Sequence, residues 1–215
     1  MGIETPGLRE SKKRETRQLI SDHATRLFIE QGFEQTTIAE IAAAARVAKK
    51  TVTNYFPRKE DLALDHHEQF TASLARAVAG RAEGESALAA LRREFDAALE
   101  ARDPVAGFAG PAFARMIAES PTLTARLRDL HDQREEALAG ALAEAAPSPT
   151  IAPRAAAALL TAAERLLFER IQELTLAGRT NDEIAVEVAP EATHAFDLLE
   201  ASLGDFAVAG AEAEA

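Results

Sequence analysis

Cysteine and tryptophan are absent from the sequence, and tyrosine occurs once among its 215 residues. Without cysteine the chain forms no disulfide and carries no thiolate chemistry, which is compatible with the reducing cytoplasm. Its longest run without a charged residue, 104–114, is far shorter than the roughly 20 apolar residues that span a bilayer. The first residues are polar and mixed in charge, unlike a secretory signal. We therefore expect a soluble cytoplasmic protein with no membrane partner.

Runs of alternating β-branched residues are also scarce, whereas alanine, leucine, glutamate and arginine are frequent. Those four residue types favour helix, and a half-buried strand needs the alternation that is missing here. Apolar residues make up 47% of the chain, which is enough to bury a core. The composition predicts an all-α protein, and the length suits one elongated domain or two small ones.

The net charge of −11 is unevenly distributed along the chain. Residues 9–59 carry eleven Lys and Arg against six Asp and Glu, whereas residues 60–215 carry thirteen against twenty-eight. A basic N-terminal part on an acidic remainder is the pattern expected when a DNA-binding module is joined to a domain that does not touch DNA. The alternative is that these charges only solvate two surfaces.

The N-terminal part begins with residues 1–10, which lack an apolar period and are expected to form a loose arm. Apolar residues at helical spacing then predict a first helix over 11–31, and Gly32 stands where a positive φ would end it. Basic residues at the start of this helix either solvate it or contact phosphate: Lys12, Lys13, Arg14 and Arg17.

Two shorter helices are predicted next, over 38–45 and 48–56. Thr37 and Glu40 have the spacing of a capping box, directly before an apolar run. The third helix is poorly built for standing alone, because Ala48 offers no side-chain cap and Lys49 and Lys50 place cations at the positive end of the helix dipole.

A negatively charged partner explains that defect, since DNA phosphates supply the charge that the helix N-terminus lacks. Further side chains of this helix carry hydrogen-bonding groups for phosphates or base edges: Thr51, Thr53, Asn54 and Tyr55. The sequence therefore predicts DNA contact by the third helix.

At this point the sequence resembles the TetR family of bacterial transcriptional regulators, over about residues 12–65. The residues that carry the resemblance are Ile20, Ala24, Leu27, Phe28, Gly32, Phe33, Thr36, Thr37, Ile41, Ala42, Val47, Thr51, Val52, Tyr55, Phe56, Lys59 and Leu62. The resemblance implies a three-helix helix-turn-helix domain joined to a C-terminal helical ligand-binding and dimerisation domain. It also implies a homodimer that binds a palindromic DNA operator.

By this resemblance, phosphates are clamped by Thr37, Tyr55 and Lys59. The major groove is faced by Lys49, Lys50, Thr51 and Asn54. Two positions depart from the family pattern: Arg46 stands where a turn glycine is usual, and Thr53 stands where an aromatic is often found. Arg46 either strains the turn or has a negative φ, and one backbone contact is weakened or missing at Thr53.

Beyond the basic part, helical spacing and Pro or Gly punctuation predict further helices. They are expected over 58–80, 85–102, 111–119, 121–145, 154–177, 182–188 and 191–206, with a linker at 146–153. We place the domain boundary after residue 57, giving a DNA-binding domain over 1–57 and a regulatory and dimerisation domain over 58–215.

The resemblance assigns the last two long helices to a homodimer interface, for which Leu159, Leu160, Leu166, Leu167, Phe196, Leu199 and Leu203 are candidates. Some of these residues must instead fill the monomer core. The resemblance also places an effector pocket among the helices that carry Phe95, Phe108, Phe113, Met116, His131 and Phe168. Plain core packing is the competing explanation for each of them.

Catalytic and cofactor motifs are missing: the sequence has no GxxxxGK[ST], GxGxxG, HExxH or GxSxG pattern. Glu191 and His194 form a lone ExxH, which a di-iron bundle needs twice, and His66–His67 reads as an exposed pair. We expect no catalytic residues, no metal site, no cofactor and no enzymatic activity.

Together these observations predict a homodimeric transcriptional repressor, released from a palindromic operator by an unknown small organic effector. Two alternatives stay open. One is a helical ligand-binding protein that keeps the helix-turn-helix only as scaffold. The other is a regulator without effector, controlled by a protein partner and having a filled core.

Overall fold

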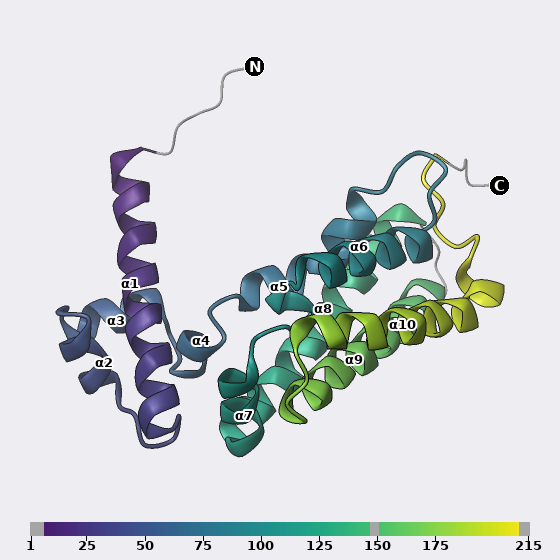
Figure 1. Ribbon diagram of the computed structural model, residues 1–215. Coiled ribbons are helices and arrows are strands. Elements are labelled where there is room, and N and C mark those ends of the chain that lie inside the picture. Colours follow the sequence, from purple (N-terminus) through teal and green to yellow (C-terminus); the bar gives the residue numbers. More distant parts are fainter. Residues whose placement is uncertain (1–6, 147–150, 211–215) are drawn as a thin grey trace. The chain divides into compact units, whose positions relative to one another are not determined.

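The structure, a computed structural model, describes residues 7–146 and 151–210, and Figure 1 traces its helices. The chain divides into two compact units. The first runs up to Asp65 and adds Met116–Arg126; the second comprises His66–Arg115 and the chain from Leu127 onward. The boundary predicted after residue 57 remains a prediction. Among the described helices none is long and apolar enough to cross a membrane.

The first unit begins with α1 (Leu8–Gln31), followed by α2 (Ile38–Ala44), α3 (Lys49–Tyr55) and α4 (Glu60–Ala63). Ile20, Ala24 and Phe28 repeat every four residues on α1 and are almost completely buried. Gly32 ends α1 with φ 89° and ψ 147°, so its φ is positive as predicted although its conformation is not left-handed helical. The ring of Phe28 then meets that of Phe33 at 5.0 Å.

The turn between α2 and α3 is a helix-ending motif with an arginine at its glycine position. The predicted capping box starts α2, with Thr37 and Glu40 exchanging hydrogen bonds. At the other end Arg46 N–H donates to the Ala43 carbonyl and Val47 N–H to the Ala42 carbonyl, the pairing of a Schellman motif. That pairing requires a positive φ, and Arg46 has φ 55°. The sequence left two outcomes open at Arg46, and the strained one holds.

A buried ion pair joins α4 to the start of α8 (Pro121–Ala145) within the first unit. Arg126 Nη2 lies 3.0 Å from Asp61 Oδ1, and the two side chains are 11% and 7% exposed. Nearby, Ser120 donates a hydrogen bond of 2.6 Å to the Glu34 carboxylate. That hydroxyl is the largest of the influences that lower the pKa of Glu34. Residues far apart in sequence thus build one unit.

The helix predicted over 58–80 is wrong as a single element. It is divided into α4 and α5 (His67–Ala79), and Leu64 between them has φ −106° and ψ 52°. Side chains of α1 explain the interruption: Ser21 donates to the Asp65 carboxylate, and Arg17 donates to the Asp65 backbone carbonyl. These contacts hold residue 65 against α1 and outweigh the local helical preference.

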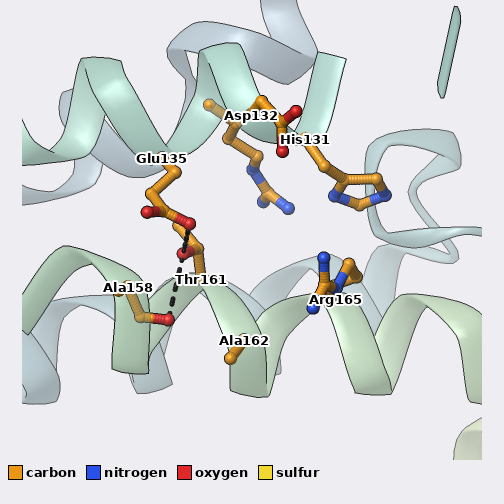
Figure 2. Close-up of a pocket in the computed structure, with 8 residues that line it drawn as sticks. His131, Asp132, Glu135, Ala158, Thr161, Ala162 and Arg165 are labelled. Carbon is orange, nitrogen blue, oxygen red and sulfur yellow. Dashed lines mark hydrogen bonds between the residues drawn. The ribbon is translucent and has the colours of Figure 1, made fainter. Parts of the chain in front are cut away.

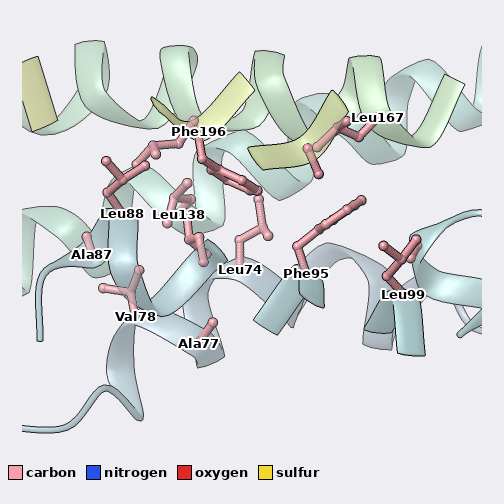
Figure 3. Packing of buried hydrophobic residues seen from close by; sticks show 14 of the residues in the cluster. Leu74, Ala77, Val78, Ala87, Leu88, Phe95, Leu99, Leu138, Leu167 and Phe196 are labelled. Atoms are coloured by element: carbon pink, nitrogen blue, oxygen red, sulfur yellow. The ribbon is translucent and has the colours of Figure 1, made fainter. Parts of the chain in front are cut away.

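The second unit contains α5, α6 (Ala87–Ala101), the short 3₁₀ helix η1 (Pro104–Ala106), α9 (Ala152–Leu176) and α10 (Asn181–Leu203). Both α7 (Pro111–Glu119) and α8 divide their residues between the units. In Figure 3, buried side chains of α5, α6, α8, α9 and α10 interlock, among them Leu88, Leu138 and Phe196. Of the predicted linker, residues 147–150 lie outside the described part.

The prediction of two separate helices at the C-terminal end is also wrong, because α10 is continuous through Pro190. A proline inside a helix removes one hydrogen bond and costs about 3 kcal/mol. Pro190 is exposed, so water reaches the groups left unpaired, and Arg170 on α9 bridges Glu187 and Glu191 on either side at 2.7 and 3.1 Å. Thr180 caps this helix, and its hydroxyl accepts a hydrogen bond from the Glu183 backbone N–H.

The strained turn gives a testable outcome. Replacing Arg46 with glycine removes the clash of Cβ at φ 55° and is expected to raise the free energy of unfolding by about 0.5–1 kcal/mol, after the entropy that glycine adds to the unfolded chain. Urea unfolding measures the difference. Arg46→Ala is the matched control, because it removes the same cation but keeps Cβ. Equal stability of the Ala and Gly variants would show that the backbone carries no strain.

Candidate functional site

The exposed side of α3 is formed by the residues that the sequence assigned to DNA contact. Val52 and Phe56 are buried and anchor the helix. Lys50 and Asn54, one turn apart, fall opposite Val52 on a helix of 3.6 residues per turn, and Lys49 and Thr53 are exposed beside them. We call Lys50 and Asn54 the outer ridge of α3.

The outer ridge carries unused hydrogen-bonding capacity. Among the described residues, no hydrogen bond or ion pair engages the side chain of Lys49, Lys50 or Asn54, and no acidic residue lies in the first turn of α3. Thr53 is different, since its hydroxyl donates to the Lys50 carbonyl at 3.1 Å. Ala48 provides no side-chain cap, as predicted. The helix therefore presents cations and an amide outward with nothing of its own to neutralise them.

The three predicted phosphate contacts take part in the protein's own structure. The Thr37 hydroxyl donates to Glu40 at 2.8 Å, and this hydrogen bond is the main cause of the lowered pKa of Glu40. Lys59 Nζ lies 4.3 Å from the centre of the Phe33 ring and 3.4 Å from the Glu34 carbonyl. Both Lys59 and Tyr55 are half-buried. Thr37 must release Glu40 before its hydroxyl donates to a phosphate.

Arg17 has a role that the sequence did not reveal. Its guanidinium lies 4.4 Å from the centre of the Phe56 ring and donates to the Tyr55 carbonyl at 3.1 Å. Sequence reasoning placed it in a basic cluster facing solvent or phosphate. The i,i+3 spacing from Arg17 to Ile20 was the one available signal, since it sets Arg17 beside the buried face of α1.

The residues predicted for an effector pocket are only partly brought together. His131 and Phe168 meet at 5.4 Å between ring centres, and both pack edge-on against Phe70, which is not among the predicted pocket residues. Phe95 instead packs against Phe196 at 6.0 Å.

Three further residues of that predicted set lie in other surroundings. Phe108 lies 6.0 Å from the guanidinium of Arg102. Met116 belongs to the first compact unit, and Phe113 is half-buried in the second.

A small polar cavity of about 50 Å³ lies between α8 and α9 (Figure 2). Its polar lining consists of His131, Asp132, Arg134, Glu135, Thr161 and Arg165, completed by Ala158 and Ala162. Sites for whole drug-sized ligands measure roughly 300–1,000 Å³, so this cavity accepts only a small group. Of the predicted pocket residues, His131 alone lines it.

Behind the cavity, Arg134 and Glu164 form a buried but incomplete ion pair. Arg134 Nη2 lies 3.6 Å from Glu164 Oε2, and the side chains are 7% and 5% exposed. Arg134 also donates to the Ser73 hydroxyl and lies over the Phe70 ring at 4.6 Å. Glu164 Oε1 is buried without a hydrogen-bond partner among the described residues.

Burial shifts the protonation of two groups here. It raises the pKa of Glu164 to about 7, because desolvation outweighs the attraction of Arg134. It lowers the pKa of His131 to about 4, aided by the positive charges of Arg134 and Arg165. His131 is therefore neutral at pH 7, and Glu164 is only partly ionised.

Metal chemistry finds little support in the geometry. Across residues 7–146 and 151–210, no group of three or more His, Cys, Asp or Glu side chains is placed to hold a metal ion. Glu191 of the ExxH pair is bound to Arg170.

Helix, turn and exposed second helix over residues 38–55 define a helix-turn-helix protein, and the predicted all-α fold is confirmed. A family model described as bacterial regulatory proteins, tetR family, matches residues 20–65. The HTH-type transcriptional regulator TcmR of Streptomyces glaucescens is 34% identical over 143 residues, which span 64% of this chain and 63% of that relative. Residues 20–65 thus resemble the N-terminal part of tetR-family regulators, and the chain spans just under two thirds of the length of the curated relative that it matches.

Solved structures share the fold over most of the chain. The SmeT–triclosan complex has a TM-score of 0.57 at 19% identity, over 94% of this chain and 98% of that one. NalD of Pseudomonas aeruginosa, the secondary repressor of the MexAB-OprM multidrug efflux pump, has a TM-score of 0.53 at 20% identity, over 85% and 97%. At such identities the likeness shows the architecture, an N-terminal helix-turn-helix with a C-terminal helical domain.

The raised pKa of Glu164 makes stability depend on pH. Between the unfolded value near 4.5 and the folded value near 7, the folded state binds more protons than the unfolded state. The contribution of Glu164 to the free energy of unfolding is therefore largest below pH 4.5. It falls by about 1–3 kcal/mol as the pH rises through 7. Urea unfolding at several pH values measures the fall.

Glu164→Gln is the matched variant, since it keeps the shape and removes the titration. The free energy of unfolding of this variant is expected to fall much less between pH 5 and 8 than that of the parent. A decline of the same size in the variant would assign the pH dependence to other groups.

Proposed function

We propose that the protein is a homodimeric transcriptional repressor that binds a palindromic DNA operator through α3. The single observation that carries this proposal is the outer ridge of α3, where Lys50 and Asn54 stand exposed without internal partners beside Lys49. Lysine binds phosphate or guanine, and asparagine pairs with adenine edges in the major groove. The match of residues 20–65 to the tetR family model supports the same assignment.

Within this proposal the other predicted contacts keep their roles. Thr37, Tyr55 and Lys59 position the helix on the DNA backbone, and Thr51 and Thr53 flank the outer ridge. The basic balance of residues 9–59 draws this unit toward DNA, and the acidic balance of the remainder repels the same polyanion. The charge distribution thus orients the protein as it approaches its operator.

The homodimer is proposed to form through α9 and α10, which pack side by side in Figure 1. Of the candidates for this surface, Leu160, Leu167, Phe196 and Leu203 are buried in the monomer core. Leu159 and Leu166 on α9 are 48% and 63% exposed, and Leu198 on α10 is 69% exposed. Exposed leucines on adjacent helices support an interface, and a dimer brings two recognition helices to half-sites about 34–36 Å apart.

We further propose that a small molecule releases the repressor. SmeT, of the same fold, forms a complex with triclosan, and the cavity between α8 and α9 gives this chain a place for a polar group. An effector that binds the DNA-free state better by a few kcal/mol suffices for strong release. The effector is proposed to enter beside His131 and Phe168, because Phe95 and Phe108 are packed into the core.

DNA binding by α3 is tested by replacing Lys49 and Lys50 together with alanine. The affinity for a duplex from the protein's own upstream region is expected to fall at least about tenfold at 0.1 M salt. The slope of log K against log salt should shrink by up to about 2, because two phosphate contacts are lost. Fluorescence anisotropy across a salt series measures both quantities.

The matched control is Arg128→Ala with Arg154→Ala, which removes the same charge from exposed positions of α8 and α9. It should leave affinity and slope nearly unchanged. The lysine variant should also be no less stable than the parent, since both cations oppose the dipole of α3. Unchanged affinity and slope in the lysine variant would remove α3 from the DNA contact.

The dimer surface is tested by placing glutamate at Leu166 and Leu198. Burying two carboxylates in an apolar interface is strongly unfavourable, so the double variant is expected to be monomeric. Light scattering gives the mass, and gel shift should show loss of the full-operator complex. Leu19→Glu on α1, which is 44% exposed, is the control for a charge on an exposed leucine. A dimer that survives both substitutions would place the interface elsewhere.

A further inference from the structure

The charges around the cavity between α8 and α9 are separated into two ends. In Figure 2, Glu135 and Thr161 lie at one end and His131 and Arg165 at the other, with the Arg165 side chain directed from α9 toward α8. The Thr161 hydroxyl lies 3.2 Å from the Glu135 carboxylate on the opposite helix, and it also lies 2.7 Å from the Ala157 carbonyl. At the end with His131 and Arg165, the contact of the Arg165 guanidinium is a distant one, 4.0 Å from Nε to the Glu169 carboxylate on the same helix, so it keeps donors for a further acceptor.

Arg134 adds a second guanidinium to this lining, and its own acid neutralises it incompletely. The 3.6 Å separation from Glu164 is longer than a hydrogen bond, and Ser73 takes only the Nε–H group. An arginine stays charged at every accessible pH and offers five donors. Arg134 therefore keeps donors and positive charge for a further acceptor.

Two positive charges act on His131 in addition to its burial. Besides burial, the charges that lower its pKa are those of Arg134 and Arg165. Asp132 and Glu135 also line the cavity but do not reverse this effect. Arg134 and Arg165 thus both act on the His131 end, although the formal charges of the lining residues cancel.

We propose that the His131 end of this cavity binds the carboxylate of a small organic acid, held by the guanidinium groups of Arg134 and Arg165. A planar carboxylate matches the paired donors of a guanidinium. The volume of about 50 Å³ is well below the roughly 150 Å³ that encloses a benzene ring, so it holds the acid group alone.

The remainder of such an acid has two places to extend. Asp132, Glu135 and Arg165 are exposed, so the cavity opens to solvent. The other flank of His131 is apolar, because its ring meets those of Phe70 and Phe168. A short apolar chain beside the carboxylate fits that flank. This carboxylate site rests on the proposed function in one respect, because the bound acid is taken to be the effector that releases the repressor from DNA.

The test uses the full-length protein and propionate, with propionamide as a neutral ligand of the same shape. Calorimetric titration is expected to show saturable binding of propionate and none of propionamide. Arg165→Gln should weaken propionate binding roughly 10- to 100-fold, the loss expected for a charged hydrogen bond. Arg154→Gln, also exposed on α9 but outside the cavity, should bind propionate like the parent. Arg165 is half-exposed, so its replacement leaves the fold intact.

Equal binding of propionamide, undiminished binding by Arg165→Gln, or tighter binding of sulfate and phosphate than of propionate would overturn the carboxylate site. A second arm follows release of a fluorescent operator duplex by propionate. Release in the parent but not in Arg165→Gln supports the effector role. Binding of propionate without release overturns that role but keeps the site, and failure of the unliganded protein to bind duplex contradicts the proposed function alone.

Discussion

Apolar burial behind α3 is the constraint on which the first compact unit depends. This helix has two turns, no side-chain cap and two lysines at its positive end, so its own backbone gives it little stability. Val52 and Phe56 hold it from behind, and Arg17 covers the Phe56 ring while binding the Tyr55 carbonyl. Because the anchor lies entirely on one side, the other side is free to carry residues chosen for a partner.

Buried charge organises the two units in contrasting ways. In the first unit Asp61 and Arg126 lie 3.0 Å apart and share a hydrogen bond, although Arg126 Nε is buried without a partner among the described residues. In the second, Arg134 and Glu164 lie 3.6 Å apart, and one carboxylate oxygen has no partner among the described residues. A close pair neutralises itself, whereas the longer one leaves charge to act on its surroundings.

Structural features that depend on neighbouring residues could be predicted from the sequence. The capping box at Thr37, the positive φ of Gly32 and the uncapped start of α3 follow from residues a few positions apart. The interruption after Leu64 did not, because it depends on Ser21 and Arg17, more than forty positions earlier. The continuity of α10 through Pro190 likewise depends on Arg170 of another helix.

The same distinction between local patterns and distant contacts applies to the candidate site. The exposure of Lys49, Lys50, Thr53 and Asn54 follows from helical geometry opposite buried Val52, whereas their contact with DNA stays a prediction. The cavity was not predicted, because Arg134, Arg165 and Ser73 come from three helices, and no periodicity shows that a guanidinium will be buried near a carboxylate. His131 was predicted as a pocket residue because of its aromatic ring. In the structure the charges of Arg134 and Arg165 also act on it.

The pairing of Asp61 with Arg126 bears on how regulators of this architecture exchange parts. A recombination that joined residues up to Asp65 to a foreign C-terminal domain would leave a buried carboxylate without its guanidinium, and Glu34 without the Ser120 hydroxyl. The first unit is therefore not one contiguous segment of the chain. A transferable form of it includes Met116–Arg126 with the N-terminal helices, or else the recipient supplies the same two partners.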